Sequence, residues 1–394
     1  MSQQLINRSP DLRQMRDEGY DIEVRSSYLL VKNVPYVNSN KEIKFGTLVS
    51  TLTLAGDITT APNNHVADFS GEYPCNKDGS EIHQIRNSSN RQQLDQDLVV
   101  EHRFSSKPLS GRYKDYYEKM TTYIAIISSP AQSLDPSVTA KTFPIIESKE
   151  EESVFHYEDT ASSRAGIRAI TRKLELGKVA IVGLGGTGSY VLDLVSKTPV
   201  KEIHLFDGDK FLQHNAFRSP GAPSVDELET GLQKVSYFAD LYSKMRKGII
   251  PYDSYIDNSN VEQLNGMDFV FLCLDKGEVK RLIIKRLEEF RIPFIDVGMG
   301  VNLVDNALLG VMRVTTSTVE QRNHIDAKGR ISFLDGNDNN EYSWNIQIAD
   351  LNALNASLAV IKWKKLFGFY VDLEKEYHCT YTIDGNMLTN EDQL

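Results

Sequence analysis

The chain has 394 residues, which by length alone favours two to three domains, and 40% of them are hydrophobic, enough to build a sizeable core. The balance of 44 basic against 54 acidic residues gives a net charge of -10, which argues against a protein that binds nucleic acid through clustered Lys and Arg. No membrane span, secretory signal or disulfide framework is expected, and we predict a cytoplasmic protein with no membrane or nucleic-acid partner.

The first part of the chain is predicted to be an α+β domain. Residues 44–54 and 121–127 are rich in β-branched and apolar side chains and are predicted to be strands. A charged run without apolar periodicity then covers residues 147–153. We therefore predict an N-terminal domain over residues 1–147, a linker over 148–153 and a second domain over 154–394.

Strands and helices alternate in the second domain. The predicted strands cover residues 178–182, 202–206, 267–274, 292–297 and 308–315, and the predicted helices cover residues 226–245, 278–290 and 345–367. Such alternation implies right-handed βαβ units and a parallel sheet, so the predicted class is α/β. The last helix carries one apolar stripe and is interpreted as structural.

A glycine-rich turn joins the first strand of this domain to a helical pattern. Gly183 permits the tight turn, Gly185 and Gly186 let the backbone approach a phosphate, and Gly188 permits close packing of helix on strand. Asp207 ends the next strand, where an acidic side chain binds ribose hydroxyls. The pattern predicts a nucleotide site, and the alternative is a tight turn that binds nothing.

Charged and polar residues follow this turn in an order that suits phosphate chemistry. Asp209, Asn215 and Arg218 lie beyond the second strand, Lys234 lies on the next helix, and Asp275 follows the strand at 267–274. An Arg and a Lys offset charge on a triphosphate, and a carboxylate holds Mg²⁺. The alternatives are solvated charges at Arg218 and Lys234, a turn residue at Asn215 and a helix cap at Asp275.

Together these residues resemble the adenylation domain of the ThiF, MoeB and ubiquitin-activating superfamily, over about residues 160–370. The resemblance rests on Gly-Leu-Gly-Gly-Thr-Gly at 183–188, Asp-Gly-Asp at 207–209, Asn-Ala-Phe-Arg at 215–218, Lys234 and Leu-Asp at 274–275. It implies a Rossmann-like doubly wound sheet and an enzyme that uses ATP and Mg²⁺. Such an enzyme adenylates the C-terminal glycine carboxylate of a ubiquitin-like protein, here in a bacterial conjugation system.

The resemblance also implies a role for each position. Asp207 would bind the ribose, while Asn215, Arg218 and Lys234 would bind the phosphates. Lys234 would also stabilise the α-phosphorus during transfer, and Asp275 would coordinate Mg²⁺. The second acid of the Asp-Gly-Asp motif is a weaker candidate for the magnesium or ribose side.

The family further supplies an arginine from a partner subunit, on a helix before the glycine loop. Residues 161–172 offer Arg164, Arg168 and Arg172, and Arg164 is the favoured candidate. An arginine acting in trans implies a homodimer. The alternative is that the three arginines merely solubilise one helix.

The sequence departs from the family at several points. Ser219 stands where a Gln usually follows the arginine, and the absence of paired Cys-x-x-Cys motifs means that no structural zinc is expected. No cysteine lies in residues 305–345, where activating enzymes carry a thioester cysteine. Cys273 is interpreted as inert core and Cys379 as an incidental exposed cysteine. The polar residues 316–340 are interpreted as a crossover loop that guides the substrate tail, or as a surface loop without a ligand.

Cys75 is the remaining candidate thiol. It lies in a turn-like segment with Lys77 nearby, and a partly exposed thiolate beside a positive charge could accept the activated carboxylate as a thioester. This reading makes residues 1–147 a conjugating-enzyme-like domain. The alternatives are a structural turn cysteine or a metal ligand.

Two other functions stay open for the whole chain. One is a non-catalytic scaffold that binds a nucleotide or a ubiquitin-like tail. The other is an NAD-dependent oxidoreductase, for which the sequence offers no clear acid or base for hydride transfer. Retention of Lys234 and Asp275 favours adenylyl transfer over both.

Overall fold

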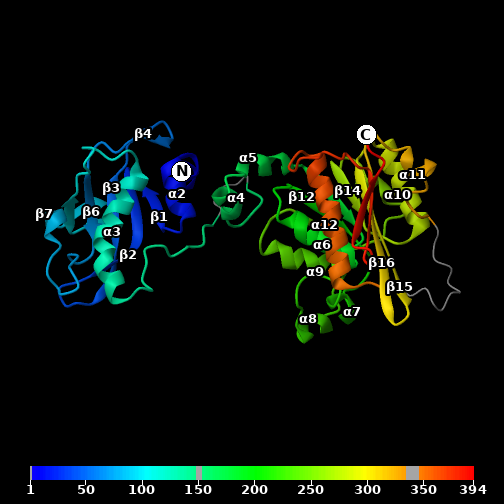
Figure 1. The fold of residues 1–394 in the computed structure, drawn as a ribbon, viewed down its shortest axis with the longest axis horizontal. Helices are drawn as coiled ribbons and strands as arrows, with labels where there is room; N and C mark the ends of the chain where they lie inside the picture. The colour runs from blue at the N-terminus through cyan, green and yellow to red at the C-terminus, as the bar shows by residue number, and fades with distance from the viewer. Residues whose placement is uncertain (1, 148–152, 334–345) are drawn as a thin grey trace. The chain divides into compact units, whose positions relative to one another are not determined.

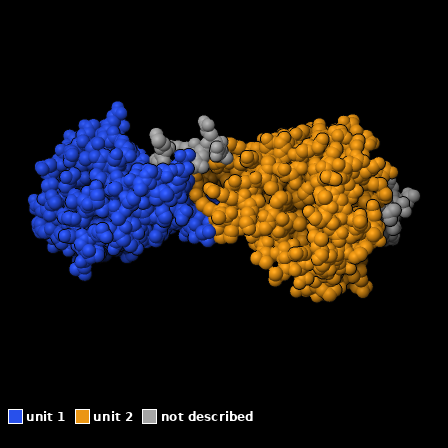
Figure 2. All heavy atoms as spheres, turned by 90° about the horizontal axis from the view of Figure 1, so that it is seen from above, with its two compact units in different colours: residues 1–149, 159–166 blue, residues 150–158, 167–394 orange. Residues whose placement is uncertain are grey.

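The structure is a computed structural model that describes residues 2–147, 153–333 and 346–394. The chain forms two compact units (Figure 2). The first contains residues 1–149 and 159–166, and the second contains residues 150–158 and 167–394. Residues 159–166, assigned to the second domain from the sequence, therefore cluster with the first unit.

The first unit is an antiparallel sheet with helices packed on it (Figure 1). Its helices are α1 (Ser2–Arg8), α2 (Pro10–Asp17), α3 (Tyr116–Leu134) and α4 (Thr160–Arg164), with a 3₁₀ turn η1 (His83–Ile85). Its strands are β1 (Ile22–Arg25), β2 (Tyr28–Val37), β3 (Ile43–Thr51), β4 (Leu54–Ala55), β5 (Ile58–Thr59), β6 (Val66–Ser70), β7 (Arg86–Ser88), β8 (Gln92–Asp95), β9 (Leu98–Val100) and β10 (His102–Ser105). The main sheet has the order β1-β2-β3-β6-β10-β7, and α3 packs against β2.

One predicted strand of this unit is wrong, because residues 121–127 lie inside α3. Asp115 caps the helix by accepting a hydrogen bond from the Glu118 N–H at 2.8 Å. The buried side chains of α3 include Tyr116, Met120, Tyr123 and Ile127, a helical spacing. The β-branched composition of the segment hid this periodicity.

The second unit is built around one large mixed sheet. Its strands are β11 (Lys178–Val182), β12 (Glu202–Phe206), β13 (Ile249–Tyr252), β14 (Phe269–Leu272), β15 (Phe294–Val304), β16 (Ala307–Ser317), β17 (His378–Thr382) and β18 (Met387–Glu391). The order is β13-β12-β11-β14-β15-β16-β17-β18. The pairs from β13 to β15 are parallel, as predicted, and those from β15 to β18 are antiparallel.

Helices cover both faces of this sheet. They are α5 (Arg168–Thr171), α6 (Gly186–Ser196), α7 (Gln213–Ala216), α8 (Val225–Glu229), α9 (Lys234–Ser243), α10 (Gly277–Glu289), α11 (His324–Ala327) and α12 (Ala349–Leu366), with 3₁₀ turns η2 (Arg172–Leu174) and η3 (Val261–Leu264). The predicted helix over 226–245 is two helices, α8 and α9, separated by a turn at Gly231, which has a positive φ.

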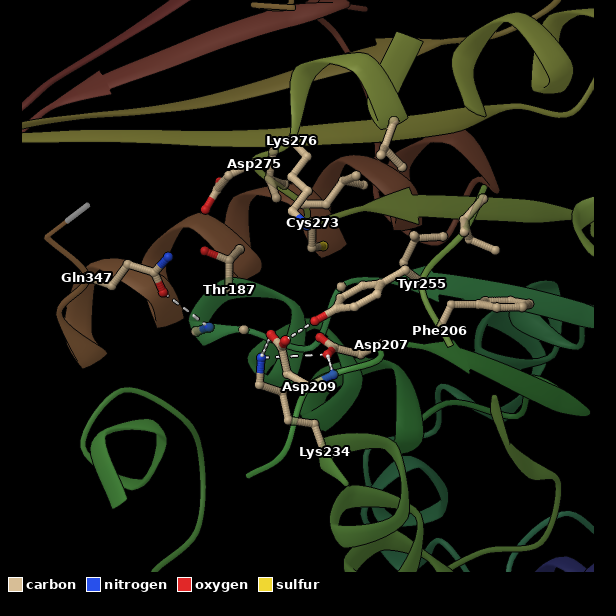
Figure 3. Close-up of a pocket in the computed structure, with 18 of the residues that line it drawn as sticks. Thr187, Phe206, Asp207, Asp209, Lys234, Tyr255, Cys273, Asp275, Lys276 and Gln347 are labelled. Atoms are coloured by element: carbon tan, nitrogen blue, oxygen red, sulfur yellow. Dashed lines mark hydrogen bonds and ion pairs between the residues drawn. The ribbon is translucent and has the colours of Figure 1, made fainter. Parts of the chain in front are cut away.

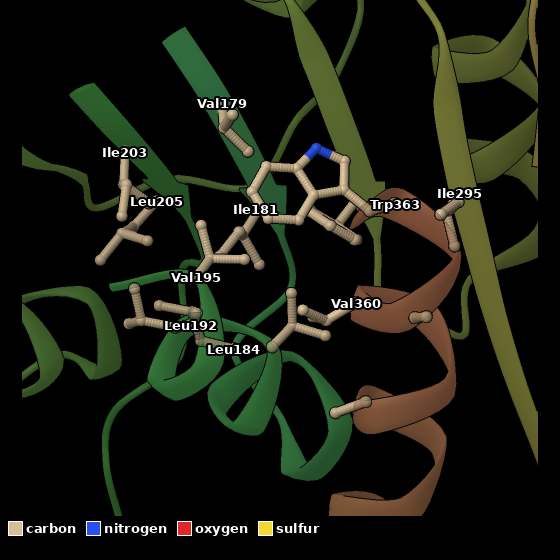
Figure 4. Packing of buried hydrophobic residues seen from close by; sticks show 14 of the residues in the cluster. Val179, Ile181, Leu184, Leu192, Val195, Ile203, Leu205, Ile295, Val360 and Trp363 are labelled. Carbon is tan, nitrogen blue, oxygen red and sulfur yellow. The ribbon is translucent and has the colours of Figure 1, made fainter. Parts of the chain in front are cut away.

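Alternate residues of the parallel strands enter two separate cores. Val179 and Ile181 of β11 pack in one cluster with side chains of α6 and α12, among them Trp363 (Figure 4). Ala180 and Val182 of the same strand pack in the other cluster with α10. A sheet buried on both faces explains why these strands are almost wholly apolar. None of the described helices is long and apolar enough to cross a membrane.

Candidate functional site

A cavity of about 430 Å³ opens where the parallel strands β11, β12 and β14 end (Figure 3). Val182 pairs with both Phe206 and Leu272, so the three carboxyl ends lie level. Such an edge is where open α/β sheets bind ligands. The residues predicted from the sequence that line the cavity are Gly183, Gly185, Gly186, Asp207, Asp209, Arg218, Lys234 and Asp275.

The glycine loop makes the tight turn that the sequence predicted. Gly183 has φ +91°, and a Cβ there would lie 2.5 Å from the carbonyl oxygen of Cys273. Gly188 does not line the cavity; it lies in α6, where a Cβ would overlap the carbonyl oxygen of Gly183. The loop thus presents the N-terminus of α6, with its N–H groups, to the cavity.

Asp207 is fastened to the glycine loop by its carboxylate. Its Oδ2 accepts a hydrogen bond from the Leu184 N–H at 2.7 Å, and its Oδ1 accepts one from the Asp209 N–H at 2.8 Å. The residue is 7% exposed and lines the cavity. Its carboxylate is therefore held rigidly beside the loop, in the position expected of a ribose-binding acid.

Lys234 is held between the two acids of the Asp-Gly-Asp motif. Its Nζ lies 2.6 Å from Asp209 Oδ2 and 3.6 Å from Asp207 Oδ1, and the residue is 5% exposed. The Tyr255 hydroxyl also donates to Asp209 (Figure 3). Burial alone would raise the pKa of Asp209, but the hydrogen bonds from Lys234 and Tyr255 outweigh it and lower the pKa. The bond to Asp209 raises the pKa of Tyr255 to about 12.

Asn215 and Arg218 differ in how they relate to the cavity. Arg218 lines it, and its buried Nε has no hydrogen-bond partner among the described residues. Asn215 is 4% exposed, and its Oδ1 accepts the Leu212 N–H at 2.8 Å. Asn215 is not among the described residues that line the cavity, so its local role is that of a turn residue.

Asp275 and Lys276 stand exposed at the end of β14 and line the cavity. The described residues contain no cluster of three or more His, Cys, Asp or Glu that could hold a metal. Mg²⁺ on a nucleotide usually takes one or two carboxylates plus phosphate oxygens and water, rather than a cage of protein ligands. A single exposed carboxylate at Asp275 fits that mode.

The cysteines do not have the properties expected of an activated thiol. Cys75 is 1% exposed, and burial, followed by the nearby Glu81, Asp78 and Glu72, raises the pKa of its thiol. The prediction of a partly exposed, activated Cys75 is therefore wrong; the residue lies in a bridge between Val37 and Glu81.

The other two cysteines are also poor nucleophiles. Cys379 was expected to be exposed, but it is 8% exposed in β17, and burial raises its pKa to about 11. Cys273 follows β14 and borders the cavity, and burial raises its pKa as well. Neither thiol is readily ionised near neutral pH.

The arginines before the glycine loop do not share one helix. Gly166, with φ +70°, separates α4 from α5, so the predicted helix over 161–172 is wrong. Arg164 is exposed at the end of α4, with its guanidinium 5.8 Å from the ring centre of Phe143. Arg168 pairs with Glu158 at 2.7 Å. The trans role of Arg164 remains a prediction.

The predicted crossover loop over 316–340 falls partly outside the described residues. Its first residues complete β16, α11 follows with a buried His324, and residues 334–340 lie in the part of the chain that is not described.

Sequence reasoning missed the contribution of the last long helix. Asn355 of α12 and Gln347, just before it, both line the cavity. The Gln347 Oε1 accepts the Gly186 N–H at 3.3 Å (Figure 3), and Asn355 Nδ2 donates to the Gly298 carbonyl at 3.0 Å. The apolar stripe of this helix indicated packing alone, and no motif signalled its amides.

Two family models match the chain, and neither spans half of it. Residues 10–160 match a "Domain of unknown function (DUF6791)", and residues 159–314 match the "ThiF family". The border between the two matches lies at α4, close to the division into compact units.

Curated relatives match about a third of the chain. "Ubiquitin-like modifier-activating enzyme 5" of Culex quinquefasciatus is 24% identical over 155 residues, which is 36% of this chain and 39% of that protein. The protein of the same name from Mus musculus is 24% identical over 155 residues, 36% of this chain and 38% of that protein. The chain thus spans about two fifths of the length of these relatives.

Solved structures give looser matches. "PaaA" is 19% identical with a TM-score of 0.43, over 57% of this chain and 76% of that one. E. coli "MccB" with ATP is 19% identical with a TM-score of 0.44, over 59% of this chain and 69% of that one. Residues 159–314 form a ThiF family domain, and most of them belong to the second unit.

Proposed function

We propose that the second unit binds ATP in this cavity and transfers the adenylyl group to a carboxylate, namely the C-terminal carboxylate of a ubiquitin-like protein. One observation carries the proposal. Arg218, Lys234 and Asp275 come from three separate segments of the chain, and all line the same cavity as the glycine loop. Two cations and a carboxylate around a phosphate-binding turn suit nucleotidyl transfer.

The cavity offers a separate environment for each part of ATP. The N-terminus of α6 presents backbone N–H groups and a positive dipole end to the phosphates. Asp207 stands beside it as an acceptor for ribose hydroxyls. Phe206, Ile256 and Val279 line the cavity with apolar surface that suits a purine base.

The proposed reaction is an in-line substitution at the α-phosphorus. A carboxylate oxygen of the substrate forms a new bond to phosphorus, the bond from that phosphorus to the α,β-bridging oxygen breaks, and pyrophosphate leaves with both bonding electrons. The product is an acyl adenylate. Lys234 and Arg218 offset the negative charge on the phosphates, for which Lys234 exchanges its contact with Asp209 for a phosphate oxygen.

Asp275 is the residue proposed to hold Mg²⁺ on the nucleotide. When bound there, the ion supplies positive charge next to the phosphates. The Asp275 carboxylate is exposed just after the end of β14, where it can reach a ligand without disrupting the core.

The proposed partner follows from the named relatives, which are ubiquitin-like modifier-activating enzymes. We further propose a bacterial conjugation system, which rests on the family resemblance of the sequence and not on these relatives. The three cysteines of the chain have raised pKa values, so any thiol that receives the activated carboxylate is assigned to another molecule.

ATP–pyrophosphate exchange tests this function. The wild-type chain and Asp275→Ala are compared with MgATP, with and without a ubiquitin-like protein ending in Gly. We expect exchange that requires the ubiquitin-like tail and falls at least about 100-fold in Asp275→Ala. ATP binding without exchange on any such tail would contradict the proposal and support a non-catalytic scaffold, whereas preferential binding of NAD would support an oxidoreductase.

A further inference from the structure

A single buried amide on α12 joins two parts of the site. Asn352 is 0% exposed. Its Oδ1 accepts a hydrogen bond from the Thr187 hydroxyl at 3.0 Å, and its Nδ2 donates to the carbonyl oxygen of Arg218 at 3.3 Å. A carbonyl oxygen requires a donor, which fixes the orientation of the amide. Asn352 therefore links the start of α6 to the backbone of Arg218, whose side chain is proposed to bind phosphate.

The glycine loop is shaped around this amide. A Cβ at Gly186 would overlap the side chain of Asn352, so the approach of α12 to the loop requires glycine there. Gly186 also donates its N–H to Gln347 at 3.3 Å. The loop and α12 are therefore closely packed at Asn352.

The backbone of Arg218 is held by hydrogen bonds: its N–H donates to the Asn215 carbonyl at 3.1 Å, and its carbonyl accepts from Asn352. The Arg218 Nε is buried and has no hydrogen-bond partner in the part of the chain that the structure describes. The side chain lines the cavity. The hydrogen bond from Asn352 to the Arg218 carbonyl therefore restrains the residue from the main-chain side.

We propose that Asn352 is a positioning residue, which holds the backbone of Arg218 in register with the glycine loop so that the guanidinium meets the terminal phosphates of ATP. This inference rests on the proposed function. It gives α12 a part in nucleotide binding, besides its packing in the core.

The inference predicts a selective loss of affinity. Asn352→Ala removes both hydrogen bonds and weakens ATP binding about tenfold, a usual effect of removing a support for a ligand-binding group. AMP lacks the β- and γ-phosphates, so its affinity stays within about twofold of wild type. Asn352→Asp weakens ATP binding further, because its second oxygen faces the Arg218 carbonyl oxygen and adds negative charge near the phosphates.

The experiment is calorimetric titration of the full chain with MgATP and with AMP. The variants are Asn352→Ala, Asn352→Asp, Arg218→Ala and the double variant Asn352→Ala with Arg218→Ala. Val360→Ala is the matched control, since Val360 is buried on the same helix but does not line the cavity. We expect the control to bind both nucleotides like wild type. The double variant should bind ATP with the same affinity as Arg218→Ala alone, because Asn352 acts through Arg218.

The outcomes separate this inference from the function on which it rests. Equal losses for ATP and AMP, or losses that add in the double variant, would show a merely structural role for Asn352. A second result would also overturn the inference: Arg218→Ala weakens ATP binding, but neither Asn352→Ala nor Asn352→Asp weakens it. The proposed function would then still stand. A wild-type chain that binds no ATP would overturn both. Asn352→Asp keeps the shape of the side chain, so the test survives if Asn352→Ala does not fold.

Discussion

Lys234 is buried, and its Nζ lies 2.6 Å from a carboxylate oxygen of Asp209 and 3.6 Å from one of Asp207. Breaking a buried ion pair leaves an uncompensated charge, so the arrangement holds the lysine in place while the site is without phosphate. A phosphate entering at the glycine loop offers the lysine a partner of higher charge. Asp209, also bonded by Tyr255, keeps a hydrogen-bond donor after Lys234 moves away.

Replacing this lysine tests its role at the level of one side chain. Lys234→Met keeps most of the apolar stem and removes the charge, and we expect the rate of ATP–pyrophosphate exchange to fall about 100-fold. Lys210→Met is the matched control, because Lys210 is exposed and does not line the cavity. An unchanged exchange rate in Lys234→Met, or an equal fall in both variants, would contradict the role assigned to Lys234.

The residues whose roles the sequence could indicate lie close together along the chain or directly after strands. The glycine loop, Asp207 and Asp275 are predictable in this way, because the carboxyl ends of parallel strands meet at one edge. Cys75 shows the limit, because it is buried and pairs with the distant Val37, which its neighbour Lys77 could not indicate. The acidic residues that further raise the pKa of its thiol are, by contrast, near it in the sequence. Asn352 lies 165 residues from its partner Thr187, and no local pattern joins them.

Among the elements, those with strong local patterns were predicted and those that depend on pairing were not. The strands β17 and β18 follow β16 only after α12, and they form because β16 offers them an antiparallel edge. Conversely, α3 has strand-like composition and becomes a helix because its buried side chains repeat at helical spacing against β2. Tertiary pairing thus decides β17 and β18, whereas the helical spacing of α3 is present in its own sequence and is hidden by its composition.

Strand β17 carries a buried histidine that makes stability depend on pH. His378 is 4% exposed, its Nδ1 lies 3.0 Å from the Thr315 hydroxyl, and burial, followed by Arg330 and Arg313, lowers its pKa to about 4. The unfolded chain binds a proton at this histidine below about pH 6.5, and the folded chain does so only below about pH 4. Neutral His378 therefore makes its full contribution to the free energy of unfolding above pH 6.5, and this contribution is lost as the pH falls toward 4.

His378→Asn tests this dependence. On acidification from pH 7.5 to 5, the wild type should lose about 2 kcal/mol more unfolding free energy than the variant. Urea unfolding followed by tryptophan fluorescence reports on the second unit, in which Trp363 is fully buried. Equal losses in wild type and variant would show that His378 does not carry the effect.

For the protein as an assembly, the family resemblance implies that residues of two chains meet in one active site. Arg164 belongs to the first compact unit, with its guanidinium near Phe143, and the glycine loop belongs to the second. We propose a homodimer in which Arg164 of one protomer acts at the cavity of the other, as the family resemblance implies.

Mixing two inactive variants tests this arrangement. Arg164→Ala and Lys234→Met should each retain little exchange activity. Random mixed dimers of the two should regain about a quarter of wild-type activity, because half of the dimers then hold one intact site. Light scattering establishes the dimer in parallel. A monomeric chain, or no recovery after subunit exchange, would contradict a trans role for Arg164.

In the proposed reaction, a carboxylate oxygen of the substrate becomes bonded to the α-phosphorus of ATP. A ubiquitin-like protein labelled with ¹⁸O in its C-terminal carboxylate tests this directly, since cleavage of the acyl adenylate at its carbonyl carbon leaves the bridging oxygen on AMP. An added thiol attacks the carbonyl carbon and takes the acyl group as a thioester, and AMP leaves. We predict that this AMP, formed in unlabelled water, carries one ¹⁸O atom, measured by mass spectrometry. AMP without label, or ADP as the product, would contradict carboxylate adenylation.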